Sequence, residues 1–408
     1  MGVKKLLQFL PKKLRHSVFR ESLSLPWNLD LNIQFKFITD QAEFLTALRV
    51  LHDSYVGKSF MKPDPLKIRL TPHHLMPSTM MAIAKVNGVV VATMSLIRDN
   101  PIGLPMEKIF DLSQLRTRGE VLCEFSSLAI SPEYRGNGGH LLHSFFRFFY
   151  RYIRTWCGVD HFVVAVNPSM AELYEAFYLF RSFQALSLAP SYQFVNGAPA
   201  VPLFLPLSDF EADLKKTYLK KTLRKNLFYF LQSSNANSDL YPCPEYFQVR
   251  STIITPSFIQ ELRKEIPDLD SRFPEEINLR IAQSLGANTF SEIGKGLLPE
   301  NLRIQMNTAT RICLKDKSDS ALARVCDVSR GGVKLFIGPN QQLREGAQSI
   351  KIKLGPNITS KVVVRPVWHN PEGYAGVSLL SADQEWIRFT NRFREDENSL
   401  AERSRRTG

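Results

Sequence analysis

The stretch "EFSSLAISPEYRGNGGHLLHSFF", residues 124–146, joins an apolar strand pattern to an amphipathic helix pattern through a glycine-rich turn. Glycines at a strand-to-helix turn let backbone N–H groups crowd together and face a phosphate, and the dipole of the following helix favours an anion there. The stretch therefore raises two alternatives: a docking site for a phosphate-bearing, acyl-carrying cofactor, or a turn with no ligand.

Alternating helix and strand patterns surround this turn between residues 31 and 205. Asp40 and Glu43 stand at capping-box spacing, which predicts the start of an α-helix. Two β-branched runs joined by Asn87-Gly88 predict a β-hairpin. The elements expected around the turn itself are a strand at 121–130, a helix at 140–157, a strand at 161–167 and a helix at 168–182. This alternation predicts an α/β domain with a mixed central sheet flanked by helices.

The rest of the chain has a different pattern. Residues from about 208 to 298 are helical and charged in pattern, without a convincing strand. Six short strand patterns between 300 and 395 predict a small all-β barrel, followed by a last helix. The expected organisation is a basic N-terminal tail at 1–30, the α/β domain at 31–207, a helical extension and linker at 208–298, the barrel at 299–396 and a disordered tail at 397–408.

Composition sets the broad class of the protein. The 408 residues are 44% hydrophobic and 22% charged, as in an ordinary soluble globular protein. The five cysteines include no Cys-x-x-Cys pair, which indicates a reducing cytoplasm rather than a disulfide scaffold. No apolar run approaches the roughly 20 residues needed to cross a bilayer. We therefore expect a cytoplasmic protein, with peripheral contact at the inner membrane left open.

The net charge of +13 suits an acidic partner, and nucleic acid, anionic lipid and an acidic carrier protein all qualify. The basic N-terminal stretch "MGVKKLLQFLPKKLRHSVFR" could lie on an anionic membrane, although a disordered tail is the favoured interpretation. Residues 215–232 carry Lys and Arg at helical spacing, and a solvated helix face is favoured there. No helix-turn-helix or zinc pattern supports nucleic-acid binding.

The unit built around the glycine turn resembles the GCN5-related N-acetyltransferase (GNAT) superfamily. Its phosphate-cradling motif matches at Arg135 and Gly138, whereas His140 stands where the family has a small residue. The following helix is similar to another family element, with Ser182 in place of the usual glycine and with Asn167, Ala171, Tyr174 and Phe183 matching.

A narrower resemblance, over roughly residues 40–205, is to the bacterial long-chain N-acyl amino acid synthases. These are relatives of acyl-homoserine-lactone synthases and draw acyl chains from acyl carrier protein. The family's strand carries a Glu followed by Ser-Arg, and this chain has Glu124 and Ser126, with Ser127 replacing the Arg. Aromatic residues of the next helix could line an acyl channel, although plain core is the favoured interpretation for Phe145, Phe146, Phe148, Phe149 and Tyr150.

The resemblance implies that an amine attacks a thioester of acyl carrier protein or coenzyme A. Glu124 would take the amine proton, and Tyr174 would protonate the departing thiolate. A backbone N–H near Ala129 or Ile130 would stabilise the oxyanion. The phosphate of the pantetheine arm would be held by Arg135, Gly136, Asn137, Gly138 and Gly139, with Asn167 nearby. No metal is expected, because His140 and His143 have no third ligand in view.

Residues 300–395 resemble a PilZ domain, the small β-barrel with which many bacteria sense cyclic di-GMP. The resemblance rests on "ARVCDVSRGGVKL", with Asp327, Ser329 and Gly332, and on the closing hairpin "VVVRPVWHNPEGYAGVSL". Arg303 aligns with the second arginine of the family's nucleotide-binding pair, and Pro299 occupies the place of the first. Binding of cyclic di-GMP and contact with a protein partner therefore both remain open.

The favoured function is an N-acyltransferase that moves a long acyl chain to the amine of a small acceptor such as an amino acid, with a regulatory PilZ domain. The alternative is a non-catalytic PilZ effector that binds cyclic di-GMP or a protein and keeps the GNAT fold as a scaffold.

Overall fold

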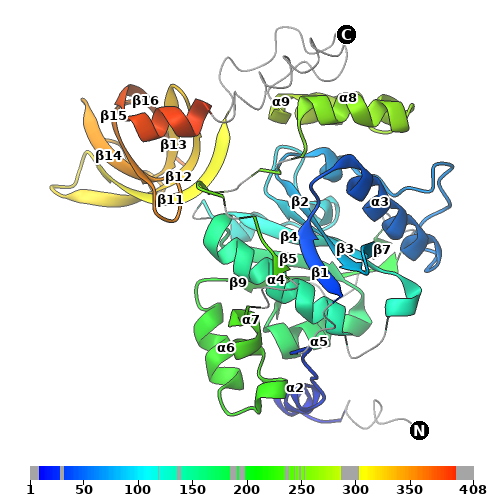
Figure 1. Cartoon of the computed structure of the whole chain (residues 1–408). Helices are drawn as coiled ribbons and strands as arrows, with labels where there is room; N and C mark the ends of the chain where they lie inside the picture. The colour runs from blue at the N-terminus through cyan, green and yellow to red at the C-terminus, as the bar shows by residue number, and fades with distance from the viewer. Residues whose placement is uncertain are drawn as a thin grey trace.

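A mixed β-sheet forms the centre of the first domain, and its described strands run in the order β10-β1-β2-β3-β4-β5-β9-β6 (Figure 1). The computed structural model describes residues 9–27, 32–117, 119–135, 139–183, 191–192, 198–234, 239–242, 244–247, 250–251, 253–285 and 303–391. The strands of this sheet are β1 (Ile33–Phe37), β2 (Thr79–Val86), β3 (Val89–Arg98), β4 (Leu122–Ile130), β5 (His161–Val166), β6 (Arg181–Ser182), β9 (Val201–Pro206) and β10 (Asp239–Leu240). Two short strands, β7 (Ser191–Tyr192) and β8 (Ala198–Pro199), pair with each other.

The predicted hairpin is confirmed. Strands β2 and β3 pair antiparallel from Thr79 opposite Ile97 to Val86 opposite Val89. Asn87 and Gly88 between them have φ angles of 51° and 82°, the left-handed conformation that a type I′ turn requires at both positions.

Helices cover both faces of the sheet, as expected for the GNAT fold (Figure 1). On one face lie α4 (His140–Trp156) and α5 (Pro168–Tyr178). Core residues of α4 include Phe145, Phe146, Phe148, Phe149 and Tyr150, as favoured. On the other face lie α3 (Gln41–Val56), α8 (Pro256–Glu265) and α9 (Glu275–Leu285). Asp40 caps α3 as predicted, because its carboxylate accepts a hydrogen bond from the Glu43 N–H at 2.8 Å.

The N-terminal stretch departs from expectation. Residues 12–21 form helix α2 (Lys12–Glu21), so the favoured interpretation as a disordered tail is wrong for them. Lys12 bonds Glu175 at 2.9 Å and Arg15 bonds Glu172 at 2.6 Å, and both glutamates lie on α5. These ion pairs give the basic residues of α2 partners on the folded domain.

The basic run at 215–232 is broken rather than one continuous helix. Helix α6 (Phe210–Tyr218) ends, the 3-10 helix η7 (Leu223–Lys225) follows, and α7 (Leu227–Gln232) begins after Asn226. The Asn226 side chain accepts a hydrogen bond from the Tyr229 N–H at 3.1 Å and so caps the new helix. Strand β10, in a region where no strand was expected, adds to the sheet parallel to β1.

The C-terminal domain is a six-stranded antiparallel barrel, as predicted, with strand order β11-β12-β13-β16-β15-β14 (Figure 1). Its end strands β11 and β14 lie side by side and nearly close it, and the Thr310 hydroxyl donates to the Lys351 carbonyl at 2.7 Å. The strands are β11 (Ile304–Cys313), β12 (Ser320–Ser329), β13 (Gly332–Phe336), β14 (Gln348–Lys353), β15 (Thr359–His369) and β16 (Tyr374–Ala382). Residues 384–391 are helical, and Trp386 and Phe389 enter the barrel core.

Candidate active site

Strand β4 carries the candidate site at the point where it separates from its neighbour β5. On its β3 side it pairs along its length, from Arg98 opposite Cys123 to Ala92 opposite Ile130. On its β5 side the described ladder ends where Glu124 lies opposite Val163. Ser127 has a φ of 53° at an irregularity in the β3–β4 register, so the strand bends just after the two strands part. The opening therefore lies directly beyond Glu124.

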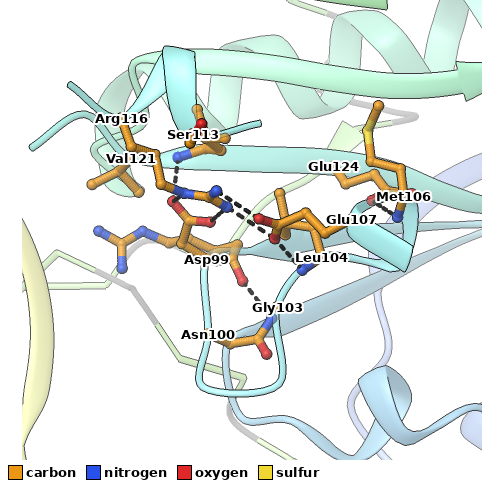
Figure 2. A network of polar contacts seen from close by, with 12 residues as sticks. Asp99, Asn100, Gly103, Leu104, Met106, Glu107, Ser113, Arg116, Val121 and Glu124 are labelled. Atoms are coloured by element: carbon orange, nitrogen blue, oxygen red, sulfur yellow. Dashed lines mark hydrogen bonds and ion pairs between the residues drawn. The ribbon is translucent and has the colours of Figure 1, made fainter. Parts of the chain in front are cut away.

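The Glu124 side chain is 2% exposed and lies against the loop that follows β3. Its Oε2 accepts a hydrogen bond from the Met106 N–H at 2.9 Å (Figure 2). Burial raises the pKa of this carboxyl to about 8, because desolvation disfavours the charged form more than the Met106 N–H stabilises it. A carboxyl with such a pKa can exchange a proton near neutral pH, as a general base must.

A network of ion pairs fixes the loop that holds Met106 (Figure 2). The Arg116 guanidinium bonds Asp99 and Glu107, each at 2.6 Å. Glu107 accepts a hydrogen bond from the Leu104 N–H at 2.7 Å, and Asp99 accepts one from the Leu122 N–H at 2.8 Å. The network therefore fastens both the loop and the first residue of β4, and so the surroundings of Glu124.

His74 is a site residue that the sequence did not indicate. It is fully buried in the 3-10 helix η1 (Pro72–Leu75), and its Nδ1 accepts a hydrogen bond from the Thr71 N–H at 3.1 Å. The proton of the neutral ring is therefore on Nε2, which lies 3.0 Å from Ser127 Oγ and donates to it. Burial lowers the pKa of His74 to about 3, so the ring stays neutral.

The hydrogen bond from His74 gives Ser127 a polar contact at the position where the resembling family has arginine. His74 fills an acceptor position of the Ser127 hydroxyl and leaves its proton available for donation. A cation is still close to His74, because the Arg69 guanidinium, which lies 4.1 Å from the ring centre of Tyr55, adds to the effect of burial in lowering the pKa of His74. Residues 53 positions apart in sequence meet at His74 and Ser127, and no local pattern signals such a contact.

Tyr174 lies in α5, and Asn167 directly precedes that helix. Burial raises the pKa of Tyr174 to about 12, so its hydroxyl is protonated near neutral pH and carries a proton that it could donate. Asn167 caps α5, since its Oδ1 accepts hydrogen bonds from the Ser169 N–H at 3.0 Å and from the Ser169 hydroxyl at 2.7 Å.

The structure describes the first and last residues of the glycine turn, Arg135 and Gly139. Arg135 folds back toward the sheet, and its guanidinium bonds the Ile130 carbonyl at 2.7 Å and the Ser54 hydroxyl of α3 at 3.1 Å. Gly139 precedes α4 with a φ of 80°, a conformation that favours glycine. The predicted ligands Gly136, Asn137 and Gly138 lie outside the described residues.

A pocket of about 240 Å³ opens beside His74, between the ends of β1 and β2 and the segments around 240 and 253. Apolar side chains dominate its walls, among them Phe37, Met81 and Tyr152. Thr79 lines it too, with its hydroxyl buried and without a hydrogen-bond partner among the described residues. An engineered cavity of about 150 Å³ is known to hold benzene, so this pocket has room for a ring or part of an alkyl chain.

The four residues expected to contact cyclic di-GMP cluster at one end of the barrel. The Arg303 guanidinium forms an ion pair with Asp327, and burial raises the pKa of that carboxyl despite this cation. The Ser329 hydroxyl donates to the Gly332 carbonyl at 3.4 Å across the β12–β13 turn. A Cβ at Gly332 would approach the Val377 carbonyl to 2.9 Å, so the close packing of β13 on β16 requires glycine here. Pro299 lies outside the described residues.

The parted strands and the bend after Glu124 are features of the GNAT fold, and the second domain is a PilZ-like barrel. Residues 46–206 match the family model of the N-acyl amino acid synthase FeeM, which confirms the resemblance expected from the sequence. No curated protein matches the chain significantly. Among the described residues, no helix is long and apolar enough to cross a membrane.

Three solved structures are similar to parts of the chain. FeeM, an N-acyl amino acid synthase from uncultured soil microbes, shares 21% identity, with 44% of this chain and 93% of that chain covered and a TM-score of 0.38. The AHL synthase LasI shares 16% identity, with 43% and 89% covered and a TM-score of 0.31. The PilZ domain of CeSA from a cellulose-synthesizing bacterium shares 15% identity, with 22% and 91% covered and a TM-score of 0.18.

Proposed function

We propose that the protein transfers a long acyl chain from a thioester of acyl carrier protein, or of coenzyme A, to the amine of a small acceptor such as an amino acid. The observation that carries this proposal is Glu124, a buried carboxyl with a pKa of about 8 at the point where β4 and β5 part. The match of residues 46–206 to an N-acyl amino acid synthase supports the acceptor class.

The proposed chemistry uses two proton carriers, Glu124 and Tyr174. Glu124 accepts a proton from the neutral amine as the nitrogen forms its bond to the thioester carbon. The carbonyl oxygen becomes negative and is stabilised by a backbone N–H of β4 near Ala129 or Ile130. The C–S bond then breaks, and the departing thiolate takes a proton from Tyr174. The products are an N-acyl amine and a free thiol.

The donor would enter over the glycine turn. The N-terminus of α4 favours an anion, and Gly139 lets the chain approach closely there. In the proposed complex, Arg135 exchanges its bonds to Ile130 and Ser54 for the phosphate of the pantetheine arm, assisted by Gly136, Asn137 and Gly138. Asn167 keeps its capping role and thereby positions the helix that carries Tyr174.

The test is direct. The full-length protein is incubated with acyl carrier protein thioesters or acyl-CoA and mixed amino acids, and the products are analysed by mass spectrometry. We expect N-acyl amino acids from the wild type and their loss in Glu124→Ala. Glu133→Ala, which removes an exposed glutamate near the same turn, is the matched control. Absence of any N-acyl product from the wild type, or unchanged turnover in Glu124→Ala, would overturn the assignment.

We further propose that the barrel regulates the acyltransferase and that cyclic di-GMP binds at the end of the barrel that carries Arg303. An arginine freed from Asp327 could fork around a phosphate or a guanine edge. Calorimetric titration of the full-length protein with cyclic di-GMP is expected to show binding that weakens about tenfold or more in Arg303→Ala. Identical titration of Arg303→Ala and the wild type would remove this role.

A further inference from the structure

Two basic segments that are distant in sequence meet at one end of the first domain, away from the barrel (Figure 1). Glu21, the last residue of α2, forms ion pairs with both Lys221 and Lys225 around η7. The chain after α2 continues along the same region, where the Leu25 N–H donates to the Arg224 carbonyl at 3.1 Å. Trp27 then packs edge-on against Phe230 of α7, with ring centres 5.5 Å apart. The two segments therefore form one continuous surface.

Helix α2 has a clear inner and outer side. Its inner side is fixed to α5 through Lys12, Arg15 and Arg20, the last of which donates to the Ala176 carbonyl at 2.8 Å. Leu14 and Val18 stand four residues apart in the helix and are exposed on its outer side, and Leu10, just before the helix, is exposed as well.

The second segment also exposes large apolar residues. The exposed large apolar residues of the two segments, between 36% and 90% exposed, are Phe9, Leu10, Leu14, Val18, Leu219, Leu223 and Tyr229. The second segment also carries cations, because residues 215–225 contain six Lys or Arg and no acidic residue. We call this set, the seven apolar residues and the six cations, the basic-apolar surface. Groups of exposed apolar residues on a soluble protein often mark an interaction site.

We propose that the basic-apolar surface binds the face of an anionic lipid bilayer. Aliphatic and aromatic side chains that project from helices among lysines are suited to the boundary between headgroups and acyl chains, and the lysines attract anionic headgroups. Helix α2, which carries part of the surface, packs against α5, the helix that carries Tyr174. If the proposed function holds, a long-chain N-acyl product would partition into the same bilayer, but the lipid contact itself does not depend on that function.

Charge complementarity alone would also fit an acidic carrier protein. The apolar residues favour the bilayer, because seven large and exposed apolar side chains accompany the lysines and arginines of the two segments. We therefore commit to the bilayer, and docking of a carrier protein becomes one outcome of the test.

The experiment is co-sedimentation of the full-length protein with vesicles of phosphatidylcholine alone or mixed with phosphatidylglycerol. Binding is expected to the mixed vesicles and to fall as salt is raised. Two variants probe the surface: Leu219→Glu/Leu223→Glu removes apolar contacts and adds charge, and Lys220→Glu/Arg224→Glu reverses two cations. Each basic residue near an anionic membrane contributes about fivefold in binding, so the second variant is expected to lose at least about 25-fold.

The matched control is Leu322→Glu/Val367→Glu, which alters two equally exposed apolar residues on the barrel. It is expected to bind vesicles as the wild type does, and all variants are expected to keep the wild-type thermal unfolding temperature. Equal vesicle binding by the wild type and both surface variants would overturn the proposal. A second result would also overturn it: the wild type binds both kinds of vesicle equally, and the two surface variants have a higher KM for acyl carrier protein. The surface would then be a docking site for the carrier protein.

Discussion

At the scale of single residues, the Glu124 carboxyl is held neutral by its surroundings. Burial raises its pKa to about 8, and the Met106 N–H, the partner that would favour the carboxylate, only partly offsets this. In the free protein the carboxylate form is therefore the minority species at pH 7 and becomes the majority species above about pH 8.

It follows that kcat/KM for acyl transfer should rise with pH and level off above about pH 8 in the wild type. Glu124→Gln keeps the size of the side chain but cannot accept the amine proton, so we expect a loss of about 10²–10⁴-fold and no inflection at this pH. Rates measured across a pH series would check both effects, with Glu133→Gln as control. A variant that retains the wild-type inflection would show that another group titrates.

His74 gives a second pH dependence, this time of stability. The folded ring has a pKa of about 3, below the ordinary histidine value of 6.5, so between these pH values the unfolded chain binds a proton that the folded chain does not. The free energy of unfolding therefore falls as the pH drops from about 6.5 toward 3, by at most about 1.4 kcal/mol per pH unit from this group.

Urea unfolding of His74→Leu is expected to show lower stability at pH 7, because Ser127 and the Thr71 N–H lose their partner, and a shallower decline on acidification. His369→Gln, at an exposed position on the barrel, is the control and should keep the wild-type slope. An unchanged acid slope in His74→Leu would mean that the ring does not titrate in this range.

At the scale of elements, strand β10 depends on one buried ion pair. Asp239 in β10 and Arg147 in α4 lie 2.9 Å apart with side chains 1% exposed, and the same guanidinium stacks 4.8 Å from the ring centre of Phe230 in α7. These contacts fasten the extension after residue 208 to the edge of the sheet.

Arg147→Met is expected to lower the free energy of unfolding by about 3–5 kcal/mol, because it removes a cation from a buried ion pair and leaves the Asp239 carboxylate buried. Arg147→Met/Asp239→Asn should cost less than the single variant, since the buried carboxylate is then gone as well. Chemical denaturation of the two variants checks this. If the double variant were the less stable of the two, the buried carboxylate would not be the cause.

The same elements show what sequence patterns could and could not predict. The hairpin at Asn87-Gly88, the cap at Asp40 and the six barrel strands follow from local rules, and the structure confirms them. Strand β10 is two residues long and is held by a helix that is distant in sequence, so no hydrophobic periodicity predicts it. The contact of His74 with Ser127 joins a 3-10 helix to a strand bend 53 residues away, which only the folded sheet brings together.

At the scale of the whole molecule, the barrel is fastened to the strands on either side of β4. Arg98, at the end of β3, is 2% exposed and donates to Gln305 Oε1 at 2.9 Å and to the Met306 carbonyl at 3.1 Å, both in β11. Asp160, just before β5, pairs with Arg324 of β12 and also accepts from the Val121 N–H at 2.8 Å. Arg98 is followed directly by Asp99, the start of the network that holds Met106 against Glu124.

Arg98→Met should therefore weaken both the domain contact and the active site. The Gln305 amide oxygen and the Met306 carbonyl would lose their donor, at a cost of about 1–3 kcal/mol. We expect calorimetry to separate the melting of the barrel from that of the first domain, and the pH at which kcat/KM levels off to shift as the loop around Met106 relaxes. Arg311→Met, at an exposed position of β11, is the control and should change neither property. If the transitions separated while the pH profile stayed unchanged, the contact would join the domains without reaching Glu124, and a regulatory signal from the barrel would need another route.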